Sequence, residues 1–276
     1  MATSSHCFAD KLLPLMQADG SFSDLKYGQD GSKSFSEHGR RLSCFGYNHI
    51  LNNGDYTDNL TLCFNYITYD APPNPDTNWW AHVIGVPTDM WQGAVLSKNI
   101  IETSLMNDFL DRWWVNTTYG PIWNHDRHDD SMAGGNLAPR AYLTEVEGHL
   151  RGRPDERHQS VKQVVRNELV LRDGWTGSGF RADGCLHQHC LKGNYTTHGQ
   201  RWLNHTIQVP YAHTYGKEFL KWMSELLSWY TDTSVDFEAD TVEGIYGAYL
   251  ECTQWLFRGQ SAEPTNAGRF ITGGND

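Results

Sequence analysis

The chain has 276 residues, of which 39 % are hydrophobic and 20 % charged, the composition of a globular protein. Its 33 acidic residues outnumber 22 Lys and Arg, and the formal charge of -11 argues against a protein that binds nucleic acid through a basic surface. No apolar run is long enough to cross a membrane, and the opening residues lack the pattern of a signal peptide. Aromatic side chains make up 13 % of the chain, which suits a large core or a surface for sugar rings.

Hydrophobic residues recur at helical spacing in seven segments, separated by connectors rich in Gly, Pro and Asn. The predicted helices are Glu37–Asn52, Tyr56–Tyr69, Met90–Trp114, Asn136–Leu150, His158–Leu171, Tyr215–Tyr230 and Val242–Phe257. Helices of these lengths predict a mainly α architecture of stacked antiparallel pairs. No linker is evident, so residues 1–276 are expected to form one domain, with residues 266–276 as a frayed tail.

Six cysteines in a chain of this size do not imply a disulfide framework, and the redox compartment stays open. Four Asn-x-Ser/Thr triplets begin at Asn59, Asn116, Asn194 and Asn204. They would accept glycans only if a eukaryotic cell secreted the chain.

Three loops contain polar residues that call for a chemical interpretation. The first, NPDTNWWAHVIGVP, places Asn78, Trp79 and Trp80 together just before a helix. Paired tryptophans in this position form a stacking platform for sugar rings, or they seal the helices beneath them. The sequence leaves both interpretations open.

The second loop, NHDRHDDSMAGGNLAPR, contains residues that could gather a cation, but without a fixed ligand spacing, so no metal is predicted. These residues are Asn124, His125, Asp126, His128, Asp129 and Asp130. Two glycines then let the backbone approach a ligand closely, and the amide of Asn136 can donate hydrogen bonds to an anion such as a carboxylate. The alternative role for Asn136 is to cap the next helix.

The third loop includes GFRADGCLHQH, in which Cys185, His187 and His189 alternate and would share a face of an extended segment. A zinc site is one interpretation, although the spacing matches no common zinc pattern, and a single histidine acting as a base is the other. Further on, YAHTYGKEFL places Tyr211 and Tyr215 at the start of a helix, where the helix dipole favours a phenolate. The alternative is that these tyrosines pack with their hydroxyls in water.

Five segments resemble, in the same order, the catalytic helical domain of the family-eight polysaccharide lyases, which include hyaluronate, chondroitin and xanthan lyases. The segments are ADGSFSDLKY with EHGRRL, NWWAHVIGVP, GGN, GFRADGCLHQH and YAHTYGKEFL. The resemblance implies an incomplete (α/α) toroid whose cleft binds an anionic polysaccharide containing uronic acid. It also implies cleavage by β-elimination and a secreted or periplasmic location.

The resemblance carries family roles to matching positions in this chain. Asn136 matches the carboxylate-neutralising asparagine, His189 the catalytic histidine and Tyr215 the catalytic tyrosine. Asn78, Trp79 and Trp80 match the aromatic patch that binds substrate.

The chain departs from the family in the distance between histidine and tyrosine. Tyr215 follows His189 by 26 positions, more than in the family, so Tyr195 or His198 is an alternative partner for His189. Tyr195, His198 and Tyr211 are otherwise expected to bind substrate.

A second departure concerns the family's catalytic arginines. Only the segment FRGQ represents their motif here, so Arg258 is the expected catalytic arginine and Arg269 its alternative. The β-sandwich domains that follow the toroid in the family are absent from this sequence.

The residue types suit an elimination, because hydrogen-bond donors stabilise the charge that builds on a uronate carboxylate while a histidine or tyrosine moves the proton. This scheme needs no metal or organic cofactor, and none is predicted. A glycoside hydrolase is the first alternative, since it needs two carboxylates, and the loops contain Asp126, Asp129, Asp130 and Asp183. A degenerate lyase that only binds carbohydrate is the second.

Overall fold

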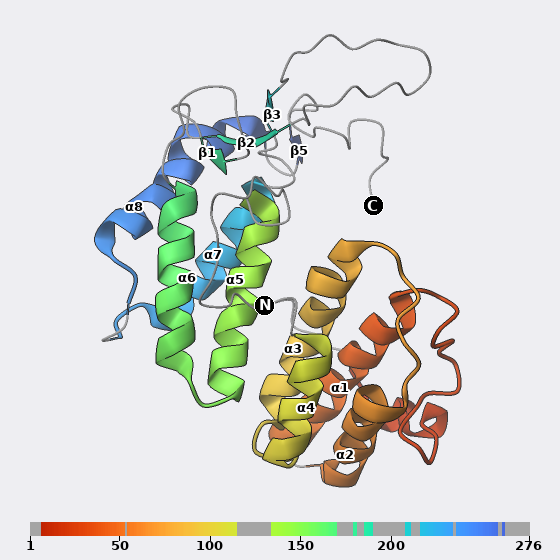
Figure 1. Cartoon of the computed structure of the whole chain (residues 1–276). Coiled ribbons are helices and arrows are strands. Elements are labelled where there is room, and N and C mark those ends of the chain that lie inside the picture. Colours follow the sequence, from red (N-terminus) through yellow and green to blue (C-terminus); the bar gives the residue numbers. More distant parts are fainter. Residues whose placement is uncertain are drawn as a thin grey trace, which may run out of the picture. The chain divides into compact units, whose positions relative to one another are not determined.

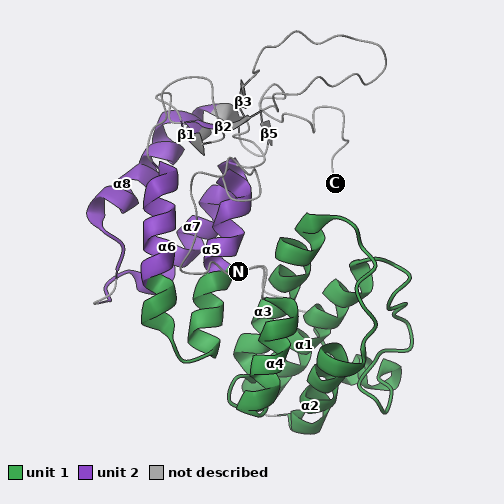
Figure 2. Ribbon diagram, in the orientation of Figure 1, with its two compact units in different colours: residues 1–120, 143–158 green, residues 121–142, 159–276 purple. Residues whose placement is uncertain are grey.

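The computed structural model describes residues 7–52, 54–114, 134–169, 179–180, 185–189, 208–210, 216–233, 236–258 and 261–262. Helices dominate these residues and the strands are short (Figure 1), which confirms the predicted mainly α class. The chain divides into two compact units, one of residues 1–120 and 143–158, the other of residues 121–142 and 159–276 (Figure 2). Helices α5 and α6 contribute residues to both units, and the single domain stays a prediction.

The α-helices are α1 (Lys33–Leu51), α2 (Thr57–Asn65), α3 (Val86–Ser97), α4 (Thr103–Trp113), α5 (Gly134–Leu150), α6 (Pro154–Leu169), α7 (Lys217–Tyr230) and α8 (Ala239–Gly247). Short 3-10 and π-helical turns are η1 (Ala9–Lys11), η2 (Leu13–Leu15), η3 (Tyr66–Asp70), η4 (Ala81–Gly85), η7 (Ala248–Cys252) and η8 (Thr253–Leu256). The strands are β1 (Gly179–Phe180), β2 (Leu186–His189), β3 (Gln208–Pro210), β4 (Phe257–Arg258) and β5 (Ser261–Ala262).

One predicted helix is wrong in extent. The segment Met90–Trp114 forms two helices, α3 and α4, separated by a turn at residues 98–102. Ile100 and Ile101 both hydrogen-bond back to Ser97, and Glu102 is extended. Adjacent β-branched residues are poor helix formers, so the chain turns there although its apolar residues continue.

In the first unit, α1 packs against both α2 and α3. Helices α1 and α2 run antiparallel, because His38 contacts Cys63 while Phe45 lies against Tyr56. Helices α1 and α3 run parallel and very close, since a Cβ atom on Gly39 would lie 2.8 Å from the Asp89 carbonyl and one on Gly46 would lie 2.7 Å from Leu96 Cβ. The pair of α1 and α2 thus has the antiparallel arrangement predicted from helix lengths, whereas α1 and α3 are parallel.

A buried histidine joins the first hairpin at its centre. His38 Nε2 donates to the Cys63 carbonyl at 3.1 Å, and the Tyr27 hydroxyl donates to Nδ1 at 2.7 Å. Burial lowers the pKa of His38 to about 3, so the ring is neutral at neutral pH. Burial likewise raises the pKa of the free Cys63 thiol to about 12.

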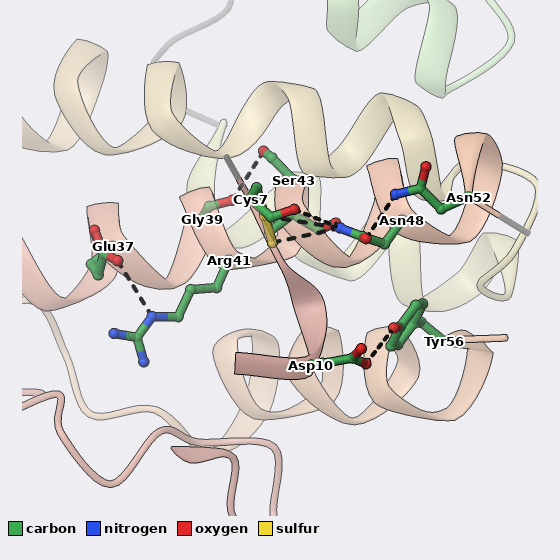
Figure 3. Close-up of a disulfide and its surroundings, with 10 residues drawn as sticks. Cys7, Asp10, Glu37, Gly39, Arg41, Ser43, Asn48, Asn52 and Tyr56 are labelled. Atoms are coloured by element: carbon green, nitrogen blue, oxygen red, sulfur yellow. Dashed lines mark hydrogen bonds and ion pairs between the residues drawn. A yellow bond between two sulfur atoms is a disulfide. The ribbon is translucent and has the colours of Figure 1, made fainter. Parts of the chain in front are cut away.

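A disulfide attaches the N-terminal segment to α1 (Figure 3). Cys7 is bonded to Cys44, and Asn48 donates its amide to the Cys44 carbonyl at 3.0 Å and to the Cys7 carbonyl at 3.3 Å. A second disulfide joins Cys185 to Cys252, and the two bonds decide a question that the cysteine count left open. The sequence count could not reveal pairs so far apart in the chain.

In the second unit, the side chain of Tyr142 on α5 packs against α7. Its ring lies 4.8 Å from Trp222 and 4.4 Å from Trp229 on α7, and its hydroxyl donates to Glu225 at 3.1 Å. On α6, Lys162 donates to the Asp236 carbonyl at 2.8 Å, just before α8. Strands β1, β2 and β3 form an antiparallel sheet, and β4 pairs with β5.

None of the helices in the described part of the chain is both long and apolar enough to cross a membrane.

Candidate active site

Asn136 lies in the first turn of α5 and is only 4 % exposed. The helix begins two residues earlier, at Gly134, so Asn136 is inside the helix and the capping alternative does not apply. Gly134 has a φ of +57°, which a residue with a side chain adopts only at a cost. The glycine therefore sets the direction in which the chain enters α5 and presents Asn136.

Gly134 is held between two other elements. Its backbone N–H donates to Glu168 Oε1 at 2.8 Å, from the last turn of α6. On another side, a Cβ atom at Gly134 would lie 2.9 Å from Leu186 Cδ2, on β2. The start of α5 thus packs directly against the strand that carries His189.

The same strand leads to the start of α7. Leu186 pairs with Phe180 of β1, whose ring lies 5.1 Å from Phe219 in the first turn of α7. Tyr215 immediately precedes Gly216, the residue that caps this helix. A continuous series of contacts therefore joins the helix start that holds Asn136, the strand that holds His189 and the helix start next to Tyr215.

The backbone of His189 pairs with Gln208 of β3 at the end of β2, while its side chain lies outside what the structure describes. Arg258 is in β4, paired with Ser261, and its side chain is likewise outside. The predicted residues Tyr195, His198, Tyr211 and Tyr215, and the alternative Arg269, lie outside the described residues. So do Asp126, Asp129, Asp130 and Asp183, the carboxylates of the hydrolase alternative, and the rest of the possible cation ligands.

The zinc interpretation of Cys185 with the two histidines is wrong. Cys185 forms a disulfide with Cys252, so its sulfur is no thiolate ligand. The bond instead fixes the start of β2 to η7, across a sequence separation of 67. Among the described residues, no group of three or more His, Cys, Asp or Glu side chains could hold a metal ion.

The aromatic patch belongs to the first unit. Trp79 and Trp80 are each 44 % exposed, at the entrance to η4. Asn78 accepts a hydrogen bond from the Trp80 backbone N–H at 3.1 Å and donates its own N–H to Asp76 at 2.9 Å. Asn78 thus orders the backbone of the turn that presents two exposed rings.

Sequence reasoning missed two buried charges beside Asn136. Glu168 is fully buried, and Arg140, one helical turn after Asn136, is 4 % exposed. The spacing of Arg140 places it on the same side of α5 as Asn136, a signal readable from the sequence once α5 is placed. Glu168 had no such signal, because a glutamate near a helix end ordinarily faces solvent.

Comparison with solved structures shows the fold. A chondroitinase AC lyase solved with oligosaccharides matches 96 % of this chain with a TM-score of 0.70 and 17 % identity. The chondroitin AC lyase of Streptomyces coelicolor A3, in complex with chondroitin sulphate, matches 94 % with a TM-score of 0.68 and 14 % identity. The xanthan lyase of Paenibacillus matches 91 % with a TM-score of 0.65 and 16 % identity.

The chain spans 36 %, 33 % and 22 % of these three structures, respectively. No model of a known protein family matches the sequence, and no curated protein does either. The chain therefore has the helical fold of polysaccharide lyases, as the sequence resemblance implied. At these sequence identities, the similarity is evidence for the fold alone.

Proposed function

We propose that this chain is the helical catalytic part of a polysaccharide lyase that cleaves a uronic-acid-containing anionic polysaccharide by β-elimination. The observation that carries the proposal is the series of contacts from Gly134 through Leu186 and Phe180 to Phe219. These contacts connect α5, β2 and the start of α7, which belong to three of the five segments that resemble the lyase motifs. The lyase fold of the chain supports the same reaction class.

In this proposal, Asn136 stabilises the charge that the substrate carboxylate gains when the neighbouring carbon loses its proton. Asn136 lies buried in the first turn of α5, and its side-chain amide carries two N–H donors. A preorganised donor in a buried site stabilises a developing anion more than water does. Arg140 adds a buried guanidinium one turn further along α5. Either residue lowers the free energy of the dianionic intermediate.

His189 and Tyr215 supply the proton transfers. A tyrosine or histidine within about 3 Å of the carbon takes its proton, and a hydroxyl that reaches the glycosidic oxygen returns one to the leaving group. Arg258 is proposed to assist. Tyr195 and His198 remain the alternatives to Tyr215, because the long insertion after His189 permits more than one alignment.

Trp79 and Trp80 are proposed to bind the polymer together with Asn78. Their exposure suits rings that stack against sugars better than rings that seal a core. Tyr195, His198 and Tyr211 are the further substrate contacts. The proposed partner is the anionic polysaccharide itself.

We also propose that the protein works outside the cytoplasm, in a secreted or periplasmic location. Two disulfides in one chain are typical of proteins from oxidising compartments. The proposed substrate is a charged polymer, which does not cross a cell membrane unaided.

The test is incubation of the purified chain with hyaluronan, chondroitin, alginate, glucuronan and xanthan-like polymers. A lyase produces an unsaturated uronate with a new ultraviolet absorbance, and equal amounts of new reducing ends. Reducing ends without that absorbance would establish the hydrolase alternative and contradict the proposal. Binding without any new ends would establish the degenerate, carbohydrate-binding alternative.

A further inference from the structure

The carboxylate of Glu168 is in an unfavourable place for its own helix. It lies in the last turn of α6, where the helix dipole disfavours a negative charge, and it is completely buried. Burial of a carboxylate costs free energy unless donors compensate it. The stability of α6 therefore does not account for a glutamate at this position.

The same carboxylate is well placed for α5. It accepts the Gly134 N–H at 2.8 Å, one of the backbone donors at the start of α5 that have no partner within the helix. A charge-assisted hydrogen bond of this kind is stronger than a neutral one, and the positive end of the α5 dipole adds to it. Glu168 thus fixes the helix start two residues before Asn136.

The other side of Gly134 is closed by Leu186. The left-handed φ at the glycine, its hydrogen bond to Glu168 and its contact with Leu186 together restrict the orientation of the turn. The orientation of this first turn sets the direction of the Asn136 Cα–Cβ bond, from which the amide extends. A small rotation there would move the amide away from the substrate carboxylate.

We propose that Glu168 is a positioning residue for Asn136, which acts by holding the Gly134 turn and does not touch the substrate. This inference rests on the proposed lyase function for its effect on turnover. The claim that the orientation of Asn136 depends on Glu168 does not require the protein to be a lyase.

The variants are Glu168→Ala, which removes the acceptor, and Glu168→Gln, which keeps an acceptor oxygen of the same shape without the charge. The matched control is Glu145→Ala, since Glu145 is equally buried and its carboxylate contacts His158 at 2.8 Å. We expect Glu168→Ala to lower kcat about 100-fold, the effect of misplacing a catalytic group by about 1 Å, with KM changed less than about threefold. Glu168→Gln should recover most of this loss.

A second measurement does not depend on activity: the NMR signal of the Asn136 side-chain amide. This signal is assigned by its loss from the spectrum of Asn136→Asp. We expect that signal to shift or broaden in Glu168→Ala, to return toward the wild-type position in Glu168→Gln and to stay unchanged in Glu145→Ala. If Glu168→Ala does not fold, Glu168→Gln alone is compared with wild type, and a small shift with a kcat loss below tenfold is expected.

An Asn136 signal unchanged in both Glu168 variants would overturn the inference, as would equal kcat losses in Glu168→Ala and Glu145→Ala. A wild-type chain without turnover on every uronate polymer would contradict the proposed function instead, and the amide signal would then decide on Glu168 by itself.

Discussion

Leu186 on β2 lies directly against Gly134 at the start of α5, so that a Cβ atom at position 134 would force the Leu186 side chain to move. The contact couples the orientation of the α5 start to the strand that carries His189. Replacing the glycine tests this coupling.

Gly134→Ala should destabilise the protein by more than the cost of a left-handed alanine alone. That cost is about 1 to 2 kcal/mol, and the clash with Leu186 adds to it. The matched control is Gly152→Ala, because Gly152 has a φ of +72° but nothing within 4 Å of its Cβ position. Urea unfolding should show the larger loss for Gly134→Ala, and only this variant should lose turnover. Equal losses of stability would show that Leu186 exerts no constraint.

The two disulfides should contribute similar stability but different effects on turnover. They close loops of 37 and 67 residues, so the chain-entropy estimate is about 4 kcal/mol for each. Because Cys185 immediately precedes β2, the double change Cys185→Ala with Cys252→Ala should lower kcat as well as the melting temperature. The corresponding change of Cys7 and Cys44 should lower the melting temperature alone.

Turnover is measured below the melting temperature of each double variant. An equal kcat in the two would show that the Cys185–Cys252 bond does not position the site.

The parts of the site that the sequence predicted are those with a local signal. The apolar periodicity around Phe219 predicted α7. The close approach of a ligand to the paired glycines before Asn136 stays a prediction. Glu168 and the Cys185–Cys252 bond depend on contacts between residues far apart in the chain, which no local pattern encodes. Local reasoning also missed the break at residues 98–102, because apolar residues continue through the turn.

Stability should fall with acid partly because of His38. Its pKa is lowered from 6.5 to about 3 by burial, so the unfolded chain binds a proton there between these values while the folded chain does not. The free energy of unfolding should therefore decrease by about 1.5 kcal/mol between pH 6.5 and about pH 5 from this residue alone. Urea unfolding of His38→Gln should show a smaller decrease over the same range than wild type. The same pH slope in both proteins would rule out His38 as its source.

Trp79 and Trp80 should contribute to binding more than to stability. Loss of a stacked ring in Trp80→Ala should weaken polymer binding by about 1 to 3 kcal/mol, whereas loss of a core tryptophan would cost about 3 to 5 kcal/mol of stability. Trp255→Ala is the control for removal of an exposed tryptophan elsewhere, since Trp255 is 73 % exposed. Binding isotherms and thermal melts of both variants distinguish rings that bind sugars from rings that pack over the helices beneath them. A large loss of stability in Trp80→Ala would favour the packing role.

The sharpest prediction concerns Asn136, His189 and Tyr215 as one catalytic unit. Asn136→Ala, His189→Ala and Tyr215→Phe should each lower turnover by about 100-fold or more, because each removes one of the three functions that elimination requires. Tyr215→Phe removes a single hydroxyl and keeps the ring. Its melting temperature should therefore match that of wild type, which separates a loss of chemistry from a loss of packing.

The controls for the tyrosine are Tyr195→Phe and His198→Ala, measured with the same ultraviolet assay. Both residues lie between His189 and Tyr215 in the sequence. If Tyr215→Phe keeps near-normal turnover while one control abolishes it, the proton donor is the residue changed in that control and the assignment of Tyr215 is wrong. If all three variants stay active, none of Tyr215, Tyr195 and His198 supplies the proton, and the proposed assignment of the donor is wrong.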